Sequence, residues 1–130
     1  MVNLMSKITD QIYVGDQQDA SNEHLYKMKL FDCIINLNDR ESEEELKLVK
    51  KYNILYASFN IFREKEKVAG YLWGAVEQGR KVLVHCEAGI DRSPFLVALY
   101  FSKKNNILLS KAYNIVKYFR PQTFIHLEWE

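Results

Sequence analysis

Short runs of apolar residues alternate along the chain with longer stretches in which apolar residues recur every three or four positions. The short runs predict four strands, over residues 8–14, 31–37, 54–59 and 82–86. The longer stretches predict five helices, over 20–29, from Ser42 onward, from Val68 to a C-cap at Gly79, over 93–104 and from Ser110 to 119. Since strands and helices alternate, we expect an α/β fold with a central, mainly parallel sheet flanked by helices.

Capping residues mark the starts of some of these helices. Ser42 followed three residues later by Glu45 is a capping box, in which each side chain bonds the other residue's backbone N–H. Ser110 is the expected N-cap of the last helix. The helix over 93–104 is apolar nearly all round, so we expect it to be central and buried.

Length and composition indicate a single domain, residues 1–130, with a substantial core. A chain of 130 residues buries roughly two-thirds of its extended surface on folding. Its 18 Lys and Arg balance 17 Asp and Glu, which argues against a general nucleic-acid binder. Its 2 cysteines and 3 scattered histidines match neither a disulfide framework nor a zinc motif, so we expect no metal and no cofactor.

The sequence shows no sign of a membrane anchor or a leader. The longest apolar runs stop well short of the ~20 residues that span a bilayer. The N-terminal MVNLMSKITD lacks the charged and then apolar pattern of a signal peptide. We therefore expect a cytoplasmic protein with reduced thiols, and we take it to be a monomer.

The chemically informative stretch is Val84–Pro94, VHCEAGIDRSP, between a buried strand and the buried helix. Open α/β sheets bind ligands at the carboxyl ends of their strands, and here loop N–H groups and the positive end of a helix converge. Arg92 adds a planar cationic fork that suits two phosphate oxygens, and Gly89 permits a tight turn. In that field Cys86 is expected to ionise more readily than a free thiol, which makes it a nucleophile aimed at phosphorus.

Taken alone, Cys86 is most simply a core cysteine at the end of a strand. Three neighbours at fixed spacing, Gly89, Arg92 and Ser93, together with the preceding His85, make coincidence a poor explanation. The segment matches the H-C-x5-R-S/T signature of the cysteine-based protein phosphatases, and the chain resembles their compact dual-specificity branch. The resemblance also takes in, in the order of that branch, Ile12–Gly15, Ile34–Leu37 and Arg120-Pro121.

The resemblance implies a metal-independent reaction in two steps. The Cys86 thiolate attacks the phosphoryl group to form a cysteinyl-phosphate, which water then hydrolyses. Ser93 stands where the family assists the departing thiolate, and His85 stands where it orients the loop. The phosphate oxygens would be bound by the Arg92 guanidinium and by the backbone N–H groups of Glu87, Ala88, Gly89, Ile90, Asp91 and Arg92.

The sequence departs from the family pattern at the general acid. The family places an aspartate in a loop well before the cysteine, and the corresponding residues 60–67, NIFREKEK, contain none. Glu64 is the nearest carboxylate and Glu66 the next, although both are more typical of a solvated surface cluster. Asp91, inside the signature, resembles the aspartate of phosphoinositide phosphatases of the myotubularin type. The alternative is that Asp91 points outward and pairs with a neighbouring cation.

We therefore expect a protein phosphatase that hydrolyses phosphotyrosine and, given a working acid, phosphoserine and phosphothreonine. An aryl phosphate leaves with little help because a phenol has a pKa of ~10. Three alternatives stay open: a phosphoinositide phosphatase, an RNA 5′-phosphatase, and a phosphate-binding module with little turnover. Cys33, on the strand over 31–37, is expected to be a core cysteine, with a redox pair to Cys86 as the alternative.

Overall fold

The computed structural model describes residues 5–130, in which one five-stranded sheet is covered by helices on both faces. The strands are β1 (Ser6–Lys7), β2 (Ile12–Gly15), β3 (Cys33–Asn36), β4 (Leu55–Ser58) and β5 (Val82–His85). The helices are α1 (Gln17–Ala20), α2 (Glu23–Lys27), α3 (Glu43–Lys51), α4 (Lys65–Glu77), α5 (Arg92–Asn105), α6 (Leu109–Phe119) and a 3-10 turn, η1 (Leu127–Trp129).

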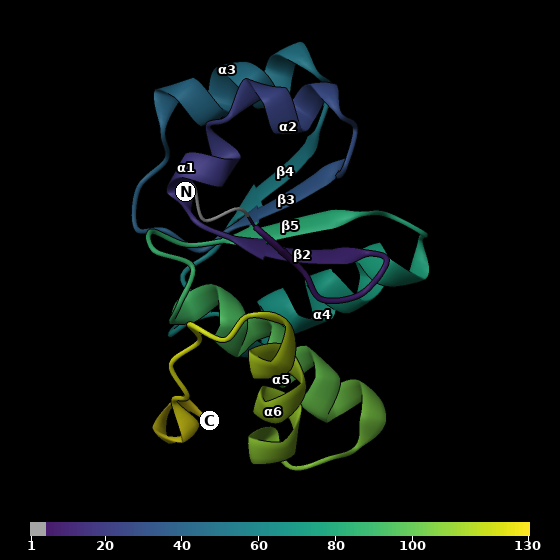
Figure 1. Cartoon of the computed structure of the whole chain (residues 1–130), viewed down its shortest axis with the longest axis vertical. Coiled ribbons are helices and arrows are strands. Elements are labelled where there is room, and N and C mark those ends of the chain that lie inside the picture. Colours follow the sequence, from purple (N-terminus) through teal and green to yellow (C-terminus); the bar gives the residue numbers. More distant parts are fainter. Residues whose placement is uncertain (1–4) are drawn as a thin grey trace.

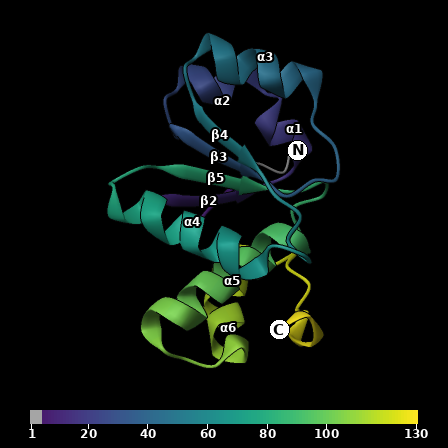
Figure 2. The same ribbon diagram turned by 180° about the vertical axis from the view of Figure 1, so that it is seen from behind.

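The sheet has the strand order β1-β2-β5-β3-β4, and every neighbouring pair except β1 with β2 is parallel. Figures 1 and 2 show α1, α2 and α3 on one face of the sheet and α4, α5 and α6 on the other. The expected α/β fold with a central, mainly parallel sheet is therefore confirmed. Because β5 lies in the middle, its carboxyl end is flanked by the carboxyl ends of β2 and β3.

Alternate side chains of the central strands enter two separate apolar clusters. Ile34 and Leu83 pack on the side of α2 and α3, whereas Ile35 and Val84 pack on the side of α4 and α5. Helix α5 is buried from Ser93 to Phe101, as its apolar composition predicts. A fully buried aliphatic side chain contributes about 1.5–3 kcal/mol, so β5 and α5 are both firmly anchored, and the loop between them has two fixed ends.

One predicted strand is shorter than expected and one predicted helix is divided. The strand predicted over 8–14 begins only at Ile12, because the Ile8 N–H donates to the Ile12 carbonyl at 2.8 Å in a turn that folds β1 back onto β2. The helix predicted over 20–29 is divided into α1 and α2. The Asn22 side chain accepts the His24 N–H at 3.1 Å and so starts a new helix at that point.

The starts of three helices differ in detail from those that the sequence predicts. Ser42 caps α3 by accepting the Glu45 N–H at 3.3 Å, but the buried Glu45 carboxylate bonds other partners, so only half of the capping box forms. Helix α4 begins at Lys65, earlier than its apolar stripe indicates. Helix α6 begins at Leu109, one residue before the expected cap Ser110.

No helix among residues 5–130 combines the length and the apolar character that crossing a membrane requires. Residues 1–4, and with them part of the N-terminal stretch that lacks a signal pattern, lie outside the described residues.

Candidate active site

The loop of residues 86–91 joins the carboxyl end of β5 to the start of α5. Parallel pairing places the last residues of β2 and β3 level with His85, the last residue of β5. The segments that follow these strands therefore meet the loop, and the Gln17 N–H donates to the Glu87 carbonyl at 3.1 Å. An α/β fold binds its ligands at this edge of the sheet.

Cys86 lies at the base of the loop and is only 2% exposed. Its Sγ atom accepts the Ser93 N–H at 3.4 Å and lies 3.3 Å from the Ser93 hydroxyl oxygen. Ser93 belongs to the first turn of α5, so the sulfur faces the positive end of a 14-residue helix. A backbone N–H and a hydroxyl are both placed to donate hydrogen bonds to the sulfur.

Arg92, the first residue of α5, turns its guanidinium toward the end of β3. Its Nη1 donates to the Leu37 carbonyl at 3.0 Å and to the Asp39 carboxylate at 3.2 Å. The Asp39 side chain is 85% exposed, so this ion pair is screened by water and adds little stability. Beside this contact lies a small pocket of about 150 Å³ lined by Asn38, Asp39, Ser58, Phe59 and Asn60.

His85 is fully buried and has an acidic partner that sequence reasoning missed. Its Nε2 lies 2.7 Å from Glu45 Oε2, and its Nδ1 lies 3.4 Å from the Cys86 carbonyl oxygen. The other oxygen of Glu45 accepts from the Gln17 amide at 2.9 Å. The S-x-x-E spacing predicts only a helix cap for Glu45. The local sequence does not show that the start of α3 lies against β5, so it could not identify Glu45 as the partner of His85.

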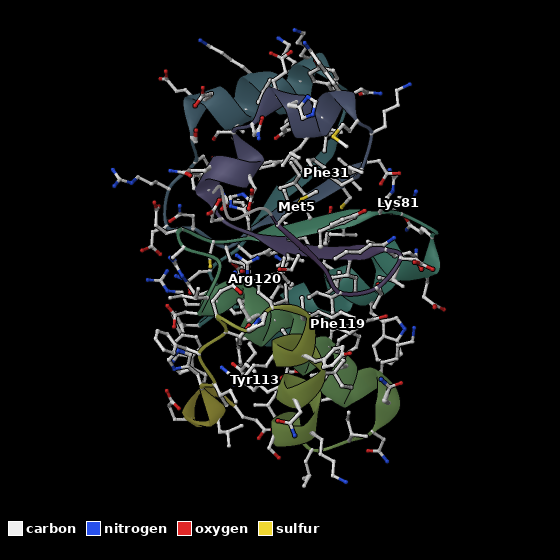
Figure 3. All side chains as sticks on the ribbon, in the orientation of Figure 1. Met5, Phe31, Lys81, Tyr113, Phe119 and Arg120 are labelled. Carbon is white, nitrogen blue, oxygen red and sulfur yellow. The ribbon has the colours of Figure 1, made fainter. Side chains whose placement is uncertain are left out.

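Gly89 turns the loop with a φ of +69°, which L side chains rarely adopt. A Cβ at this position would lie 2.6 Å from Arg120 Nη2 and 2.6 Å from the Gly15 carbonyl oxygen, so the space admits glycine alone. Arg120, labelled in Figure 3, is 1% exposed and donates through Nε to the Gly89 carbonyl at 2.7 Å. Sequence reasoning included Arg120 in the resemblance but did not place it against the loop.

Asp91 precedes Arg92 and makes no side-chain cap on α5. Its Oδ1 lies 2.7 Å from Nε2 of His126, whose Nδ1 lies 2.8 Å from Glu128. Burial by itself lowers the pKa of His126, but the hydrogen bonds to Asp91 and Glu128 outweigh burial, and the net pKa shift is upward. Sequence reasoning did not identify His126, because nothing near it in the chain marks it as a neighbour of the loop.

The other candidate acids lie at the start of α4. Glu64 accepts the Asn60 N–H at 2.9 Å and forms an ion pair with Lys67 at 3.6 Å. Glu66 pairs with a lysine of α5 at 2.6 Å. Within residues 5–130, the polar contacts of Glu64 stay in its own loop and helix, and the structure does not bring its carboxylate into contact with Cys86.

Cys33 begins β3 level with Val82, four residues before Cys86. A strand rises about 3.3 Å per residue, so the two cysteines lie on the order of 13 Å apart, beyond the reach of a disulfide. Cys33 is fully buried, and burial raises the pKa of its thiol to about 11. The structure therefore favours a core cysteine and contradicts the alternative of a redox pair.

The arrangement can bind an oxyanion next to a nucleophile. A buried sulfur, the loop backbone, the start of a helix and an arginine converge at one edge of the sheet, and this combination is typical of phosphate sites. Within residues 5–130 no set of three His, Cys, Asp or Glu side chains is arranged to hold a metal ion.

Comparisons with known proteins find relatives along nearly the whole chain. The family model described as dual specificity phosphatase, catalytic domain, matches residues 12–128. Mouse dual specificity protein phosphatase 14 is 31% identical over 122 residues, which cover 90% of this chain and 61% of the mouse protein. A protein of Invertebrate iridescent virus 6 named as a tyrosine phosphatase is 32% identical over 112 residues, which cover 86% of this chain and 77% of the viral protein.

Solved structures share the architecture. Cydia pomonella PTP-2 phosphatase matches with a TM-score of 0.82 at 19% identity, covering 98% of this chain and 86% of that chain. Human DUSP28 matches with a TM-score of 0.80 at 15% identity, covering 99% of this chain and 89% of that chain. At such identities these structures support the fold alone. The chain spans 61% of the length of the mouse relative. The activity and substrates of the whole mouse protein are therefore not assigned to this chain.

Proposed function

The chain belongs to the dual specificity phosphatase family, and from this membership we propose that it hydrolyses phosphotyrosine in proteins through a cysteinyl-phosphate on Cys86, without a metal ion. Membership makes the domain a protein phosphatase, a hydrolase whose substrates are phosphorylated proteins. The observation that carries the proposed route is the contact of Cys86 Sγ with the N–H and hydroxyl of Ser93 at the start of α5.

In the first step the Cys86 thiolate attacks phosphorus, so that an S–P bond forms and the bond from phosphorus to the tyrosine oxygen breaks. The three equatorial oxygens accept hydrogen bonds from the backbone N–H groups of residues 87–92 and from the Arg92 guanidinium. These donors stabilise the charge that the transition state spreads over those oxygens. The departing phenolate takes its proton from water.

In the second step water attacks phosphorus and the S–P bond breaks. The water protons remain with the product phosphate, and Cys86 departs as a thiolate. Ser93 Oγ, 3.3 Å from the sulfur, donates a hydrogen bond that stabilises the departing charge. His85, held by Glu45 at 2.7 Å, keeps the loop oriented through both steps.

The proposed preference for phosphotyrosine follows from the two candidate acids. Asp91 is engaged by His126, and Glu64 is engaged by Asn60 and Lys67. We therefore propose that the leaving group departs with little help from an acid, which a phenolate tolerates and an alkoxide does not. A phosphotyrosine peptide is expected to be hydrolysed about 100-fold or more faster than its matched phosphoserine peptide. Comparable rates on the two peptides would mean that a working acid exists.

The experiment that tests the function compares wild type with Cys86→Ser on an aryl phosphate in the presence of a metal chelator. Cys86→Ser is expected to lose about 1,000-fold or more of kcat, because no other group can form the covalent intermediate. Cys33→Ala is the matched control, since Cys33 lies in the core away from the loop. Turnover that survives Cys86→Ser rejects the cysteinyl-phosphate route.

Two further results would replace parts of the proposal. A folded, reduced wild type that binds tungstate but turns over nothing is a phosphate-binding module. An inositol phosphate hydrolysed faster than any phosphopeptide points to a lipid headgroup as the substrate.

We also propose that the enzyme works in the cytoplasm, where thiols stay reduced. We propose further that it is a monomer, which a measurement of its mass in solution tests.

A further inference from the structure

A single segment of the chain supports the second half of the loop that carries the proposed phosphate site. We name residues 120–129 the C-terminal segment. Three consecutive loop residues, Gly89, Ile90 and Asp91, are held in the same order by Arg120, Phe124 and His126. The three contacts measure 2.7, 2.8 and 2.7 Å. The first two bond the loop backbone, whereas His126 bonds a side chain.

His126 is held on three sides. Nε2 lies 2.7 Å from Asp91, and Nδ1 lies 2.8 Å from Glu128. The ring stacks on Trp129 with 3.8 Å between centroids and 7° between planes. Its side chain is 23% exposed, so solvent reaches it while its neighbours fix its orientation.

Trp129, on which His126 stacks, is itself anchored to the body of the domain. Its ring packs edge-on against Phe62, at 5.0 Å, and against Phe95 of α5, at 5.5 Å. The Lys65 ammonium at the start of α4 donates to the Trp129 carbonyl at 3.0 Å. The position of His126 is therefore tied to α4 and α5, and not to the C-terminal segment alone.

The two carboxylates determine the charge on the ring. An ionised carboxylate only accepts hydrogen bonds, so bonding Asp91 and Glu128 together requires N–H on both ring nitrogens, as in an imidazolium. The net upward pKa shift of His126 agrees with this. The other titratable groups nearby are Arg92 beside Asp91, Lys65 on the Trp129 carbonyl, and Tyr113 of α6, whose pKa burial raises to about 12.

We propose that His126 is a positioning residue of the phosphate site, which as an imidazolium holds Asp91 and with it the second half of the phosphate-binding loop. This inference rests on the proposed function, because it assigns a means of control to the same site. Loss of the proton leaves the ring one N–H donor for two carboxylates, so one of the two hydrogen bonds breaks and the loop loses a tether. Oxyanion affinity then falls as the pH rises.

The direction with pH follows from the raised pKa of His126. A group whose pKa is raised in the folded state contributes its full stabilisation below its ordinary pKa of about 6.5, and this is lost as the pH rises through the raised value. His126 therefore holds Asp91 and the loop best on the acidic side, and the affinity loss lies above about pH 6.5.

The test measures tungstate binding by calorimetry between pH 6.5 and pH 9 for wild type, His126→Gln and the remote control His24→Gln. Wild type and His24→Gln are expected to lose about 3- to 10-fold in affinity over this range, the worth of one charge-assisted hydrogen bond at a partly exposed site. His126→Gln is expected to start weaker by a similar factor and to show no such loss, because an amide keeps one donor and does not titrate.

A double-mutant comparison shows whether His126 acts through Asp91. In an Asp91→Asn background, His126→Gln is expected to change tungstate affinity by less than about twofold. Equal pH dependence in wild type and His126→Gln, or an undiminished effect of His126→Gln in the Asp91→Asn background, overturns the proposal. If His126→Gln does not fold, Glu128→Gln replaces it. With glutamine at position 128, the single N–H of a neutral ring suffices for Asp91, so the affinity loss at high pH is expected to shrink below about twofold, and an undiminished loss rejects the proposal.

Tungstate binding needs no turnover, so this test is separate from that of the function. Absent turnover with the expected pH dependence of binding rejects the phosphatase mechanism and retains the role of His126. Cys86-dependent turnover together with a pH-independent tungstate affinity retains the phosphatase mechanism and rejects the role of His126.

Discussion

At the residue scale, the conformation of the loop depends on a glycine and on buried side chains as much as on the residues proposed to react. Gly89 has no side chain, and this absence lets Arg120 and the Gly15 carbonyl approach the loop backbone. Cys86 is only 2% exposed, and Ser93 at the start of α5 contacts its sulfur. Packing therefore fixes the position of Cys86, the proposed nucleophile, and the turn at Gly89 brings together the residues around it.

Gly89→Ala is expected to destabilise the fold by about 2–4 kcal/mol, since the new Cβ meets two atoms at 2.6 Å and the φ of +69° disfavours any side chain. Urea unfolding measures this. Gly74→Ala is the matched control, because an added Cβ there meets nothing within 4 Å beyond its chain neighbours and its own helix backbone, and alanine favours the helix by about 1 kcal/mol. A Gly89→Ala variant as stable as wild type would show that the crowding at Gly89 relaxes at no cost.

At the scale of elements, β5, the loop and α5 act as one unit that α3 secures from the side. Strand β5 is buried along its whole length, and α5 is buried over most of its own. Glu45 of α3 reaches His85 at the end of β5, and both side chains are 0% exposed. Removing one member of a buried pair leaves the other without a partner, which costs more than the pair itself contributes.

Glu45→Ala is therefore expected to cost about 3 kcal/mol of unfolding free energy and to lower kcat, because His85 then loses the partner that orients it. Glu44→Ala, one residue away and exposed, should stay within about 0.5 kcal/mol of wild type. Denaturant midpoints and aryl phosphate kinetics on the same samples provide the comparison. Equal midpoints for the two variants would show that the His85–Glu45 contact does not stabilise the fold.

At the scale of the whole molecule, the site is assembled from segments that are distant in sequence. Leu37 follows β3, Cys86 follows β5, and Arg120 and His126 follow α6. Each of these segments contacts the loop or Arg92 directly. An oxyanion bound among them has its contacts only when the sheet and both helical layers are folded, so binding and global folding are linked.

Tungstate at about 100 times its Kd is therefore expected to stabilise the fold by about 2.7 kcal/mol, which raises the Tm of a domain of this size by about 10 °C. Calorimetric scans at matched ionic strength measure the shift. Arg92→Ala should lose most of it, whereas Arg80→Ala, at the opposite end of the sheet, should keep it. A shift of equal size in both variants would mean that the anion binds elsewhere.

The sequence by itself determined most of the elements and located the candidate site. Apolar periodicity depends on which face of an element is buried, so it predicted the central strands, the buried α5 and the α/β class. The order HCEAGIDRS is contiguous and lies between two predictable elements, so the loop and its candidate residues were visible without a structure. The late start of the strand at Ile12 and the division of the helix over 20–29 were missed because they depend on local hydrogen bonds at Ile8 and Asn22.

Tertiary structure alone decided which distant residues support the loop. Glu45 reads locally as half of a capping box, and only the packing of α3 against β5 places its carboxylate on His85. His126 and Asp91 are 35 residues apart, and no spacing rule connects them. Strand register likewise separates Cys33 from Cys86. The physical reason is common to all three: short-range pattern reflects the burial of each element, whereas side-chain partners depend on how separate elements pack together.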